Sequence, residues 1–212
     1  MTSGVKRKRQ RKRLDPDPNV RNALLDAASD VLREEGVGGL SVAQVLDRAA
    51  LSTRAFYRHF DSKDALVSEV FTEMARAETR RLKRRMASAA NPSEAVVAWI
   101  DGRLDLAFND RIRSDLRQMS LEAQTQMFAA PALVGDAYGE ILKPLVEQLE
   151  SGKDVGLFPD ADPMADALSI HGVIWASVER QWATGDCDRV AVRDRVVRFC
   201  LRGLGAMPVD ER

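Results

Sequence analysis

The chain has 212 residues, of which 45% are hydrophobic, and this is enough for the core of one large domain or two small ones. Its net charge is zero, but residues 1–63 hold 13 basic and 8 acidic residues whereas residues 64–212 hold 19 and 24, so only the front of the chain is suited to meet a polyanion. No stretch is apolar enough to span a membrane and no apolar run follows the basic N-terminus as in a signal peptide, so we expect a cytoplasmic protein without a membrane partner.

The first 18 residues are expected to form a disordered basic arm. Seven of the eight residues from Lys6 to Arg13 are basic, and the alternating Asp and Pro of residues 15–18 stop an early helix. Two roles remain open for this arm. It can be a minor-groove arm or a nonspecific electrostatic tether, and the absence of any shape cue in the run favours the tether.

The pattern that follows is helical. Glycine and proline are modest in number and alternating β-branched runs are few, so the sequence predicts an all-α chain. A first helix is expected from Asn19 to Glu35, ended by Gly36. Residues 41–60 then predict two short helices joined by a tight turn, with Ser41 and Ser52 as their N-caps.

Each of the two short helices has one apolar face. The first carries Val42, Val45, Leu46 and Ala49; the second carries Leu51, Ala55, Phe56 and Phe60. The opposite face of the second helix holds hydrogen-bond donors, a cation and a phenol, uninterrupted by any acid. A short helix with a buried aromatic back and such a front suits the DNA major groove.

The match extends beyond a general helix-turn-helix. Phe56-Tyr57-Arg58-His59-Phe60, followed by Ser62-Lys63-Asp64-Ala65-Leu66, resembles the signature of the TetR family of bacterial repressors, and the resemblance is specific from about Arg21 to Phe71. One departure is Ala50, where the family often has glycine before the recognition helix. If residue 50 needs a positive φ, alanine costs about 1 kcal/mol more there.

The resemblance implies that Tyr57, His59 and Lys63 hold phosphates, which agrees with their chemistry as donors. Base reading is expected from the start of the second helix, where Arg54 can bind a guanine edge bidentately, and from the helix before it. The DNA-binding candidates are Ser41, Gln44, Ser52, Thr53, Arg54, Tyr57, Arg58, His59 and Lys63.

The rest of the chain predicts six more helices. Asp61 or Ser62 caps a long helix that runs to about Ala89 and spans ~40 Å. The others are expected at about 92–108, 111–128, 132–149, 164–183 and 189–204. We therefore expect the arm at 1–18, a helix-turn-helix DNA-binding domain at 19–65, and a helical effector-binding and dimerisation domain at 66–212.

Polar residues interrupt apolar faces in this second domain. Taken singly, each Met or aromatic residue at helical spacing is explained by ordinary core packing. As a group they match a pocket between helices, which pairs apolar walls with a few polar groups, and the resemblance implies an effector pocket there. The effector-binding candidates are Trp99, Arg103, Leu106, Met119, Glu122, Met127, Tyr138, His171 and Trp175.

The last two helices carry apolar stripes. These consist of Leu168, His171, Trp175, Val178 and Trp182 on one helix, and of Val192, Val196, Phe199 and Gly203 on the other. The stripes can close a monomer core or a dimer, and the resemblance implies a homodimer through these two helices. One helix can serve the dimer and the pocket on adjacent faces.

The sequence favours a transcriptional repressor released from a near-palindromic operator by a small, mostly apolar effector. An enzyme is disfavoured because Ser52, His59 and Asp61 lie in one short segment and no Gly-x-Ser-x-Gly elbow is present. No cofactor, catalytic residue or metal site is expected, since Cys187 and Cys200 lack metal-ligand spacing and the two histidines are far apart. An architectural DNA-binding protein is the alternative, although it leaves the second domain without a task.

Overall fold

The computed structural model describes residues 17–109, 114–185 and 188–206, and all regular secondary structure in these ranges is helical. The expected all-α class is confirmed. The helices are α1 Pro18–Gly39, α2 Val42–Ala49, α3 Thr53–His59, α4 Lys63–Met86, α5 Pro92–Phe108, α6 Ser114–Ala129, η1 Pro131–Leu133, α7 Gly135–Asp154, α8 Pro163–Thr184 and α9 Arg189–Gly203. No helix in the described part of the chain is both long and apolar enough to cross a bilayer.

Short polar residues set the helix starts. The hydroxyls of Ser41, Ser52 and Ser62 each accept a hydrogen bond from the backbone N–H three residues on, at 3.3, 3.3 and 3.0 Å. Asn91 does the same for α5. The predicted caps at Ser41 and Ser52 are confirmed. They could be predicted because helix capping depends on the local sequence. The predicted end of the first helix coincides with a kink at Gly36, whose φ of 70° lies in the left-handed region.

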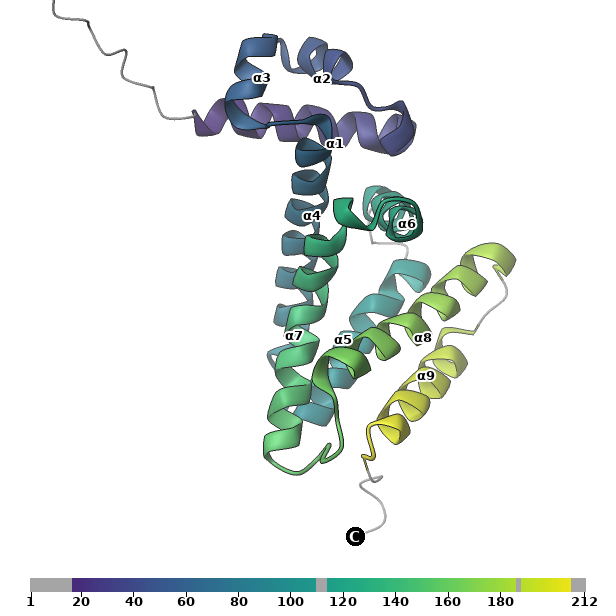
Figure 1. The fold of residues 1–212 in the computed structure, drawn as a ribbon. Helices are drawn as coiled ribbons and strands as arrows, with labels where there is room; N and C mark the ends of the chain where they lie inside the picture. The colour runs from purple at the N-terminus through teal and green to yellow at the C-terminus, as the bar shows by residue number, and fades with distance from the viewer. Residues whose placement is uncertain (1–16, 110–113, 186–187, 207–212) are drawn as a thin grey trace, which may run out of the picture.

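The three N-terminal helices sit together at one end of α4. Figure 1 shows α1 lying across the top of α4, with α2 and α3 above α1 and the other helices below. The expected domain boundary at residue 65 falls inside the first turn of α4, so a single helix belongs to both halves. That boundary stays a prediction.

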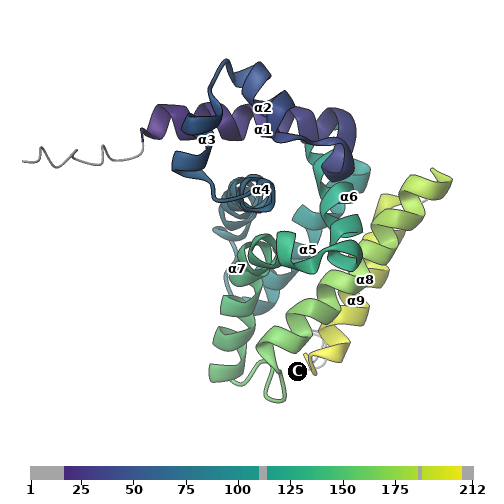
Figure 2. The ribbon, with the colours of Figure 1, turned by 45° about the horizontal axis from the view of Figure 1, so that its top comes forward.

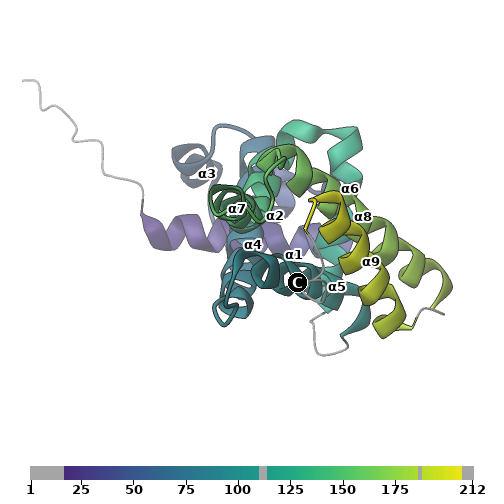
Figure 3. The ribbon, with the colours of Figure 1, turned by 90° about the horizontal axis from the view of Figure 1, so that it is seen from below.

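In the lower half, α4 packs along α7, and α5 lies against α4, α7, α8 and α9. Helices α8 and α9 lie side by side along one edge of the molecule (Figure 2, Figure 3). One cluster of buried apolar side chains runs through both halves and includes Phe56, Leu66 and Trp99, all fully buried. The helix-turn-helix is therefore joined to the rest by a shared core.

A proline inside α7 is matched by a hydrogen bond from α4. Pro144 has no N–H, so the carbonyl of Glu140, four residues before it, has no donor within α7. Thr79 of α4 fills the gap, because its Oγ1 donates to that carbonyl oxygen at 2.8 Å. The bond fixes α7 to α4 at mid-length.

Ion pairs attach α5 to its neighbours. Arg103 of α5 pairs with Glu78 of α4 at 3.1 Å, and both side chains are buried. Asp101 of α5 pairs with Arg193 of α9 at 2.6 Å. Since breaking a buried pair leaves an uncompensated charge, the Arg103–Glu78 pair fixes how α5 sits on α4.

Candidate DNA interface and candidate ligand site

The turn between α2 and α3 adopts a left-handed conformation at Ala50. This residue has φ 52° and ψ 43°, and the Leu51 N–H donates to the Leu46 carbonyl at 3.0 Å to close the turn. Ala50 is the only residue other than glycine with a positive φ in the described ranges. Alanine at this position therefore costs about 1 kcal/mol relative to glycine, as the sequence analysis expected for a positive φ.

Helix α3 buries its aromatic back and exposes its polar front. Phe56 is fully buried, and its ring lies 5.9 Å from that of Phe60. On the other side Tyr57 is 61% exposed, an unusual position for a large aromatic side chain. Thr53, Arg54 and Arg58 are also exposed. These four DNA-binding candidates form one solvent-facing surface, which we call the α3 face.

Three candidates serve the helix starts instead of projecting freely. Gln44 completes a capping box with Ser41, accepting from the Ser41 backbone N–H at 2.9 Å. The Gln44 amide also donates to both oxygens of Glu35, at 3.0 and 2.9 Å. The Ser52 hydroxyl caps α3. Sequence reasoning foresaw both serine caps but missed the role of Gln44, which depends on the packing of α2 against α1.

Lys63 and His59 are half-buried, unlike the four residues of the α3 face. The Lys63 ammonium donates to the backbone carbonyls of Val37 and Leu40, at 3.4 and 3.1 Å. It therefore holds the end of α1 and the residue that follows it against the start of α4, a structural role that sequence reasoning missed. His59 has a buried Nδ1 without a hydrogen-bond partner. Their expected phosphate contacts remain predictions.

The positive charge of the front half comes from the arm. Residues 17–63 contain 6 basic and 7 acidic residues, so this segment has a net charge of −1. Some of its cations are already paired: Arg48 with Glu34 at 2.7 Å and Arg21 with Glu69 at 2.8 Å. The run Lys6–Arg13 lies outside the described residues, and it carries the excess cations of this half.

The second half contains a cluster of rings around His171, all from predicted effector-binding residues. The centre of the His171 ring lies 5.3 Å from that of Tyr138, 6.2 Å from Trp175 and 6.5 Å from Trp99. The Trp175 ring is stacked on His171 at an interplanar angle of 15°. Helices α5, α7 and α8 thus place four predicted residues together, and we call this group the ring cluster.

Polar atoms without partners surround the ring cluster. Among the described residues, six buried side-chain nitrogens lack a hydrogen-bond partner, and five of them lie here. They are Nε of Arg103, Nδ1 and Nε2 of His171, and Nε1 of Trp175 and Trp182. A buried donor left unsatisfied costs about 1–3 kcal/mol, so their concentration in one place requires an explanation. Sequence reasoning assigned Trp182 to the dimer and did not place it here.

The ionisable groups of this site have shifted pKa values. Burial, assisted by the Arg103 guanidinium, lowers the pKa of His171 to about 3, so the ring is neutral at physiological pH. Burial raises the pKa of Tyr138 to about 12. Burial pushes the pKa of Glu78 upward, but Arg81 and Arg103 outweigh it and hold that pKa below its usual value. The buried charges of Arg103 and Glu78 cancel one another.

The other effector-binding candidates lie away from this group or play other roles. Leu106 is fully buried on α5. Glu122 of α6 accepts from the Val37 N–H at 3.0 Å and lies against Gly36. Met127 is half-buried on the same helix, α6. The α6 candidates therefore do not join the polar anchors of the ring cluster.

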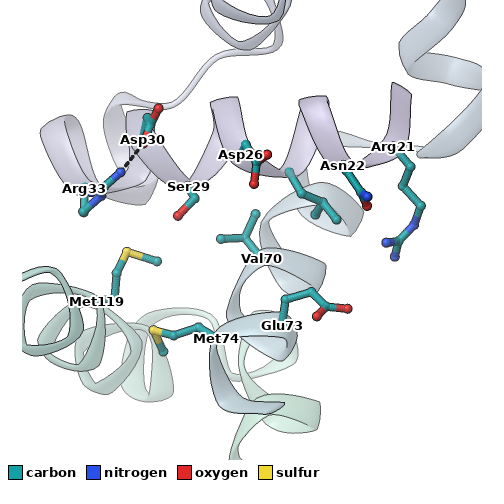
Figure 4. A pocket seen from close by; sticks show the side chains of 11 residues that line it. Arg21, Asn22, Asp26, Ser29, Asp30, Arg33, Val70, Glu73, Met74 and Met119 are labelled. Atoms are coloured by element: carbon teal, nitrogen blue, oxygen red, sulfur yellow. Dashed lines mark hydrogen bonds and ion pairs between the residues drawn. The ribbon is translucent and has the colours of Figure 1, made fainter. Parts of the chain in front are cut away.

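Met119 lines a different hollow, between α1, α4 and α6. Figure 4 shows this cleft of about 710 Å³, with Met119, Met74 and Val70 on its apolar side. Asp26, Asp30 and Arg33 of α1 border it, and Arg33 and Asp30 pair with one another. The cleft lies beside the place where α6 contacts α1. Elsewhere, burial raises the pKa of the Cys200 thiol to about 11, and Cys187 lies outside the described residues.

The comparisons with known proteins agree with this architecture. Residues 24–70 match the model of the bacterial regulatory proteins of the tetR family. The A-factor receptor protein of Streptomyces griseus is 27% identical over 151 residues, which is 70% of this chain and 50% of that protein. The chain therefore spans about half the length of this relative. The transcriptional repressor KstR2 of Mycobacterium tuberculosis is 25% identical over 188 residues, covering 87% of this chain and 92% of the repressor.

Solved structures show the same fold. The regulator FadR from Bacillus subtilis, in complex with stearoyl-CoA, has a TM-score of 0.65 at 20% identity, covering 86% of this chain and 98% of FadR. Reduced NemR from E. coli has a TM-score of 0.62 at 18% identity, covering 90% and 100%. The segment from residue 24 to residue 70, which contains the helix-turn-helix, therefore matches the tetR family, and the chain as a whole shares its fold with these regulators. This confirms the resemblance drawn from Phe56 to Leu66.

Proposed function

We propose that this protein is a transcriptional repressor that binds double-stranded operator DNA as a homodimer in the cytoplasm and is released by a small molecule. The α3 face carries this proposal: a short helix, fixed by buried Phe56 and Phe60, presents Thr53, Arg54 and Tyr57 to solvent. Such a helix fits the major groove with its N-terminal residues at the base edges. The names of the relatives, a receptor protein and a repressor, support the same role.

In this proposal the α3 residues have different tasks. Arg54 and Thr53, in the first turn, read base edges, because only groups that reach the groove floor carry sequence information. Tyr57 and Arg58, one turn later, bind phosphates, and the arm adds sequence-independent attraction. Two copies related by a two-fold axis would place α3 in major grooves ~34 Å apart, which requires a near-palindromic operator.

The homodimer is proposed through α8 and α9. Within one chain most of their stripes are already used, since His171, Trp175, Val178, Val192 and Val196 are buried. Leu168 and Phe199 remain 49% and 64% exposed, and Phe199 lies in a groove of about 400 Å³ between arginines of α9. A two-fold contact allows this exposed apolar surface to cover its own copy.

The ring cluster is the proposed effector site. Its unpartnered nitrogens and aromatic walls are the features of a pocket for a mostly apolar molecule. An effector that binds better to one arrangement of the helices shifts the protein away from the arrangement that fits DNA. The stearoyl-CoA held by the FadR structure supports a small-molecule ligand in a protein of this fold.

The proposal is tested with the DNA upstream of the protein's own gene. Footprinting with the full chain should protect a near-palindrome whose half-sites are about one helical turn apart. A candidate effector should then remove the footprint in the same concentration range in which it quenches tryptophan fluorescence, because one equilibrium links the two sites. Uniform protection of all DNA, insensitive to any ligand, would instead support the architectural alternative.

A further inference from the structure

A cleft lies in the angle between α1 and α4, and α6 borders its far side (Figure 4). Its volume of about 710 Å³ falls within the range of about 300–1,000 Å³ that is typical of small-molecule sites. None of the residues that line it belongs to the ring cluster or to the α3 face. We call it the α1 cleft. A molecule bound there would lie apart from both the proposed effector site and the proposed DNA interface.

One wall of the α1 cleft is apolar. Val70 and Met74 of α4 and Met119 of α6 form it. Figure 4 shows both methionine side chains below α1, at the end of the cleft that α6 borders. Met74 is half-buried, so part of its side chain remains open to a ligand. Methionine is flexible and polarisable, and a wall that contains two of them adapts to apolar molecules of different shapes.

The opposite wall is a polar face of α1, and the cleft has one acidic group in excess. Three ion pairs account for every charged side chain that lines the cleft except Asp26: they are Arg21–Glu69, Asp30–Arg33 and Glu73–Arg76. The side chain of Asp26 has no ion pair or hydrogen bond within the described part of the chain. The α1 cleft therefore has a net charge of −1, which comes from Asp26.

Two neutral side chains with acceptor oxygens flank Asp26 on α1. Asn22 lies one turn before it and Ser29 one turn after it, and both line the cleft (Figure 4). Neither side chain has a hydrogen bond to another residue in the described ranges. A carboxylate, an amide oxygen and a hydroxyl oxygen thus stand in a row, because residues three and four apart share one face of a helix. A primary ammonium group has three N–H donors and can donate to such a row.

The charge of the cleft selects among head groups. An anionic head group would be repelled by Asp26, and the guanidinium groups of Arg21 and Arg33 are already paired. A neutral head group avoids this repulsion but gains no attraction from the carboxylate. Charge complementarity therefore favours a cation, and the methionine wall favours an apolar body attached to it.

We propose that the α1 cleft is a second ligand site, which binds an organic cation. Its ammonium group donates to Asp26 and the acceptors beside it, and its apolar body packs on the two methionines. This inference goes beyond the proposed function, which places the effector at the ring cluster. The bound cation bridges α1 and α6, which already meet where Glu122 binds the Val37 N–H. It therefore stabilises the described arrangement of the two halves and raises the melting temperature.

The test uses three probes with one apolar body and different head groups: biphenylmethylammonium, biphenylmethanol and biphenylacetate. Isothermal titration calorimetry with the full chain at low salt measures their affinities. The ammonium probe should bind about threefold to fivefold more tightly than the alcohol, which is the value of an ion pair at an exposed carboxylate. Biphenylacetate should bind more weakly than the alcohol, and the preference for the cation should shrink as salt is added.

Two variants with matched controls locate the probe. Asp26→Asn keeps the size of the side chain and removes its charge, so the ammonium and the alcohol should bind equally, with the alcohol affinity within about twofold of wild type. Asp160→Asn makes the same change at an exposed position between α7 and α8, far from the cleft, and should keep the preference. Met74→Gln should weaken all three probes alike, by about threefold, because the wall becomes polar. Met164→Gln, at a 52% exposed position in α8, should leave the three affinities unchanged.

Each outcome decides the proposal. Biphenylacetate that binds as tightly as the ammonium probe overturns it, as does a preference that survives in Asp26→Asn or disappears in Asp160→Asn. The absence of binding heat and of a melting shift with all three probes would make the cleft an ordinary surface hollow and also overturn it. All three tryptophans lie outside the cleft, so fluorescence quenching that persists in Asp26→Asn would place the probe at the ring cluster instead. None of these measurements involves DNA, so failure here leaves the proposed repressor function intact.

Discussion

His171 shows how an interior that suits a ligand is costly to the free protein. The imidazole is 8% exposed and has no hydrogen-bond partner on either nitrogen. The groups that face it are Arg103, whose charge opposes its protonation, and Tyr138, which stays neutral because burial raises its pKa. The folded protein therefore holds His171 neutral well below the pH at which a free histidine becomes charged.

We expect this residue to make stability fall in mild acid. A histidine with a depressed pKa takes up its proton only on unfolding once the pH drops below about 6.5, so the unfolded state gains free energy from there down to about pH 3. At about pH 5 the cost is roughly 2 kcal/mol. Urea unfolding of wild type and His171→Phe at about pH 7 and pH 5 measures it. A wild type that loses no more stability than the variant would contradict the assigned neutral state.

Ala50 gives a second prediction at this scale. Its left-handed backbone favours glycine, so Ala50→Gly should raise the free energy of unfolding by up to about 1 kcal/mol. Ala43, exposed within α2, is the matched control, because the same substitution in a regular helix should lower stability by about 1 kcal/mol. Urea denaturation of both variants checks the pair, and destabilisation by both would mean that the turn is not strained.

Some site residues could be predicted from sequence and others could not. The α3 residues were predictable because a helix of known phase and one buried aromatic face fix which side chains point outward. Glu78 was not, because its partner Arg103 lies 25 positions away and only the packing of α4 on α5 joins them. The roles of Lys63 and Glu122 were missed for the same reason: both bind backbone atoms at the end of α1, which no side-chain pattern reveals.

At the scale of elements, the arm and the helices after it differ in net charge. Residues 1–13 hold seven cations and no acid, whereas residues 17–63 have a net charge of −1. Binding to DNA should therefore depend on the arm for most of its sequence-independent attraction, while the α3 face supplies discrimination.

Deleting residues 1–13 should weaken DNA binding strongly at low salt and much less at high salt. Each phosphate that the shortened protein no longer neutralises lowers the salt slope by about 0.9. Fluorescence anisotropy across a salt series, with operator and random duplexes, measures both slope and preference. Retained preference with weaker overall affinity supports the tether, and poorer discrimination at A·T flanks supports a minor-groove arm. An unchanged slope would remove the arm from the interface.

The helices themselves were largely predictable, because their ends depend on local signals. Ser41 and Ser52 cap as expected, and Ser62 is the one of the two offered residues, Asp61 and Ser62, that caps the long helix. This helix, predicted to about Ala89, ends at Met86. What sequence did not show was the contact between Thr79 and the carbonyl exposed by Pro144, because it depends on the register of two helices that are 61 residues apart at this contact.

At the scale of the whole molecule, the peptide of Val37 connects the two halves. Its N–H donates to Glu122 of α6 at 3.0 Å and its carbonyl accepts from Lys63 at the start of α4 at 3.4 Å. Gln118 of α6 also donates to the carbonyl of Arg33. The Tyr138 hydroxyl of the ring cluster donates to Gln124 of α6 at 2.5 Å. A shift of α6 would therefore pull on the end of α1, which gives the proposed effector site a route to the α3 face.

Replacing Glu122 should uncouple the two sites. Glu122→Ala should reduce the effect of a DNA-releasing effector on operator affinity several-fold and leave the effector affinity of the DNA-free protein unchanged, since coupling energies are typically 1–3 kcal/mol. Glu122→Gln, which can still accept from Val37, is the control. Measuring effector affinity with and without operator gives the coupling energy. Full coupling in the alanine variant would exclude this route.

The oligomer is tested with the exposed residues of α8 and α9. Leu168→Glu combined with Phe199→Glu should give monomers with native helicity, because four buried acids would meet at a two-fold contact. Trp182 is left in place, since its ring packs 5.5 Å from Trp175 and a charge there would disturb the interior. Phe128→Glu, at an 83% exposed position on α6, should stay dimeric. Sedimentation decides, and a monomeric wild type at micromolar concentration would end the dimer proposal.

Because α4 is long, a small tilt of this helix produces a large displacement of α3 at its end. Its 24 residues span ~36 Å, with the DNA-binding helices at one end and Thr79 bonded to α7 further along. A tilt of about 5° about the far end would displace α3 by ~3 Å, and two-fold symmetry would change the separation of the two α3 helices by up to ~6 Å. This is close to two base-pair steps of ~3.4 Å. One recognition helix would then be out of register with its half-site while the other stayed seated, so the molecule would leave DNA one groove at a time.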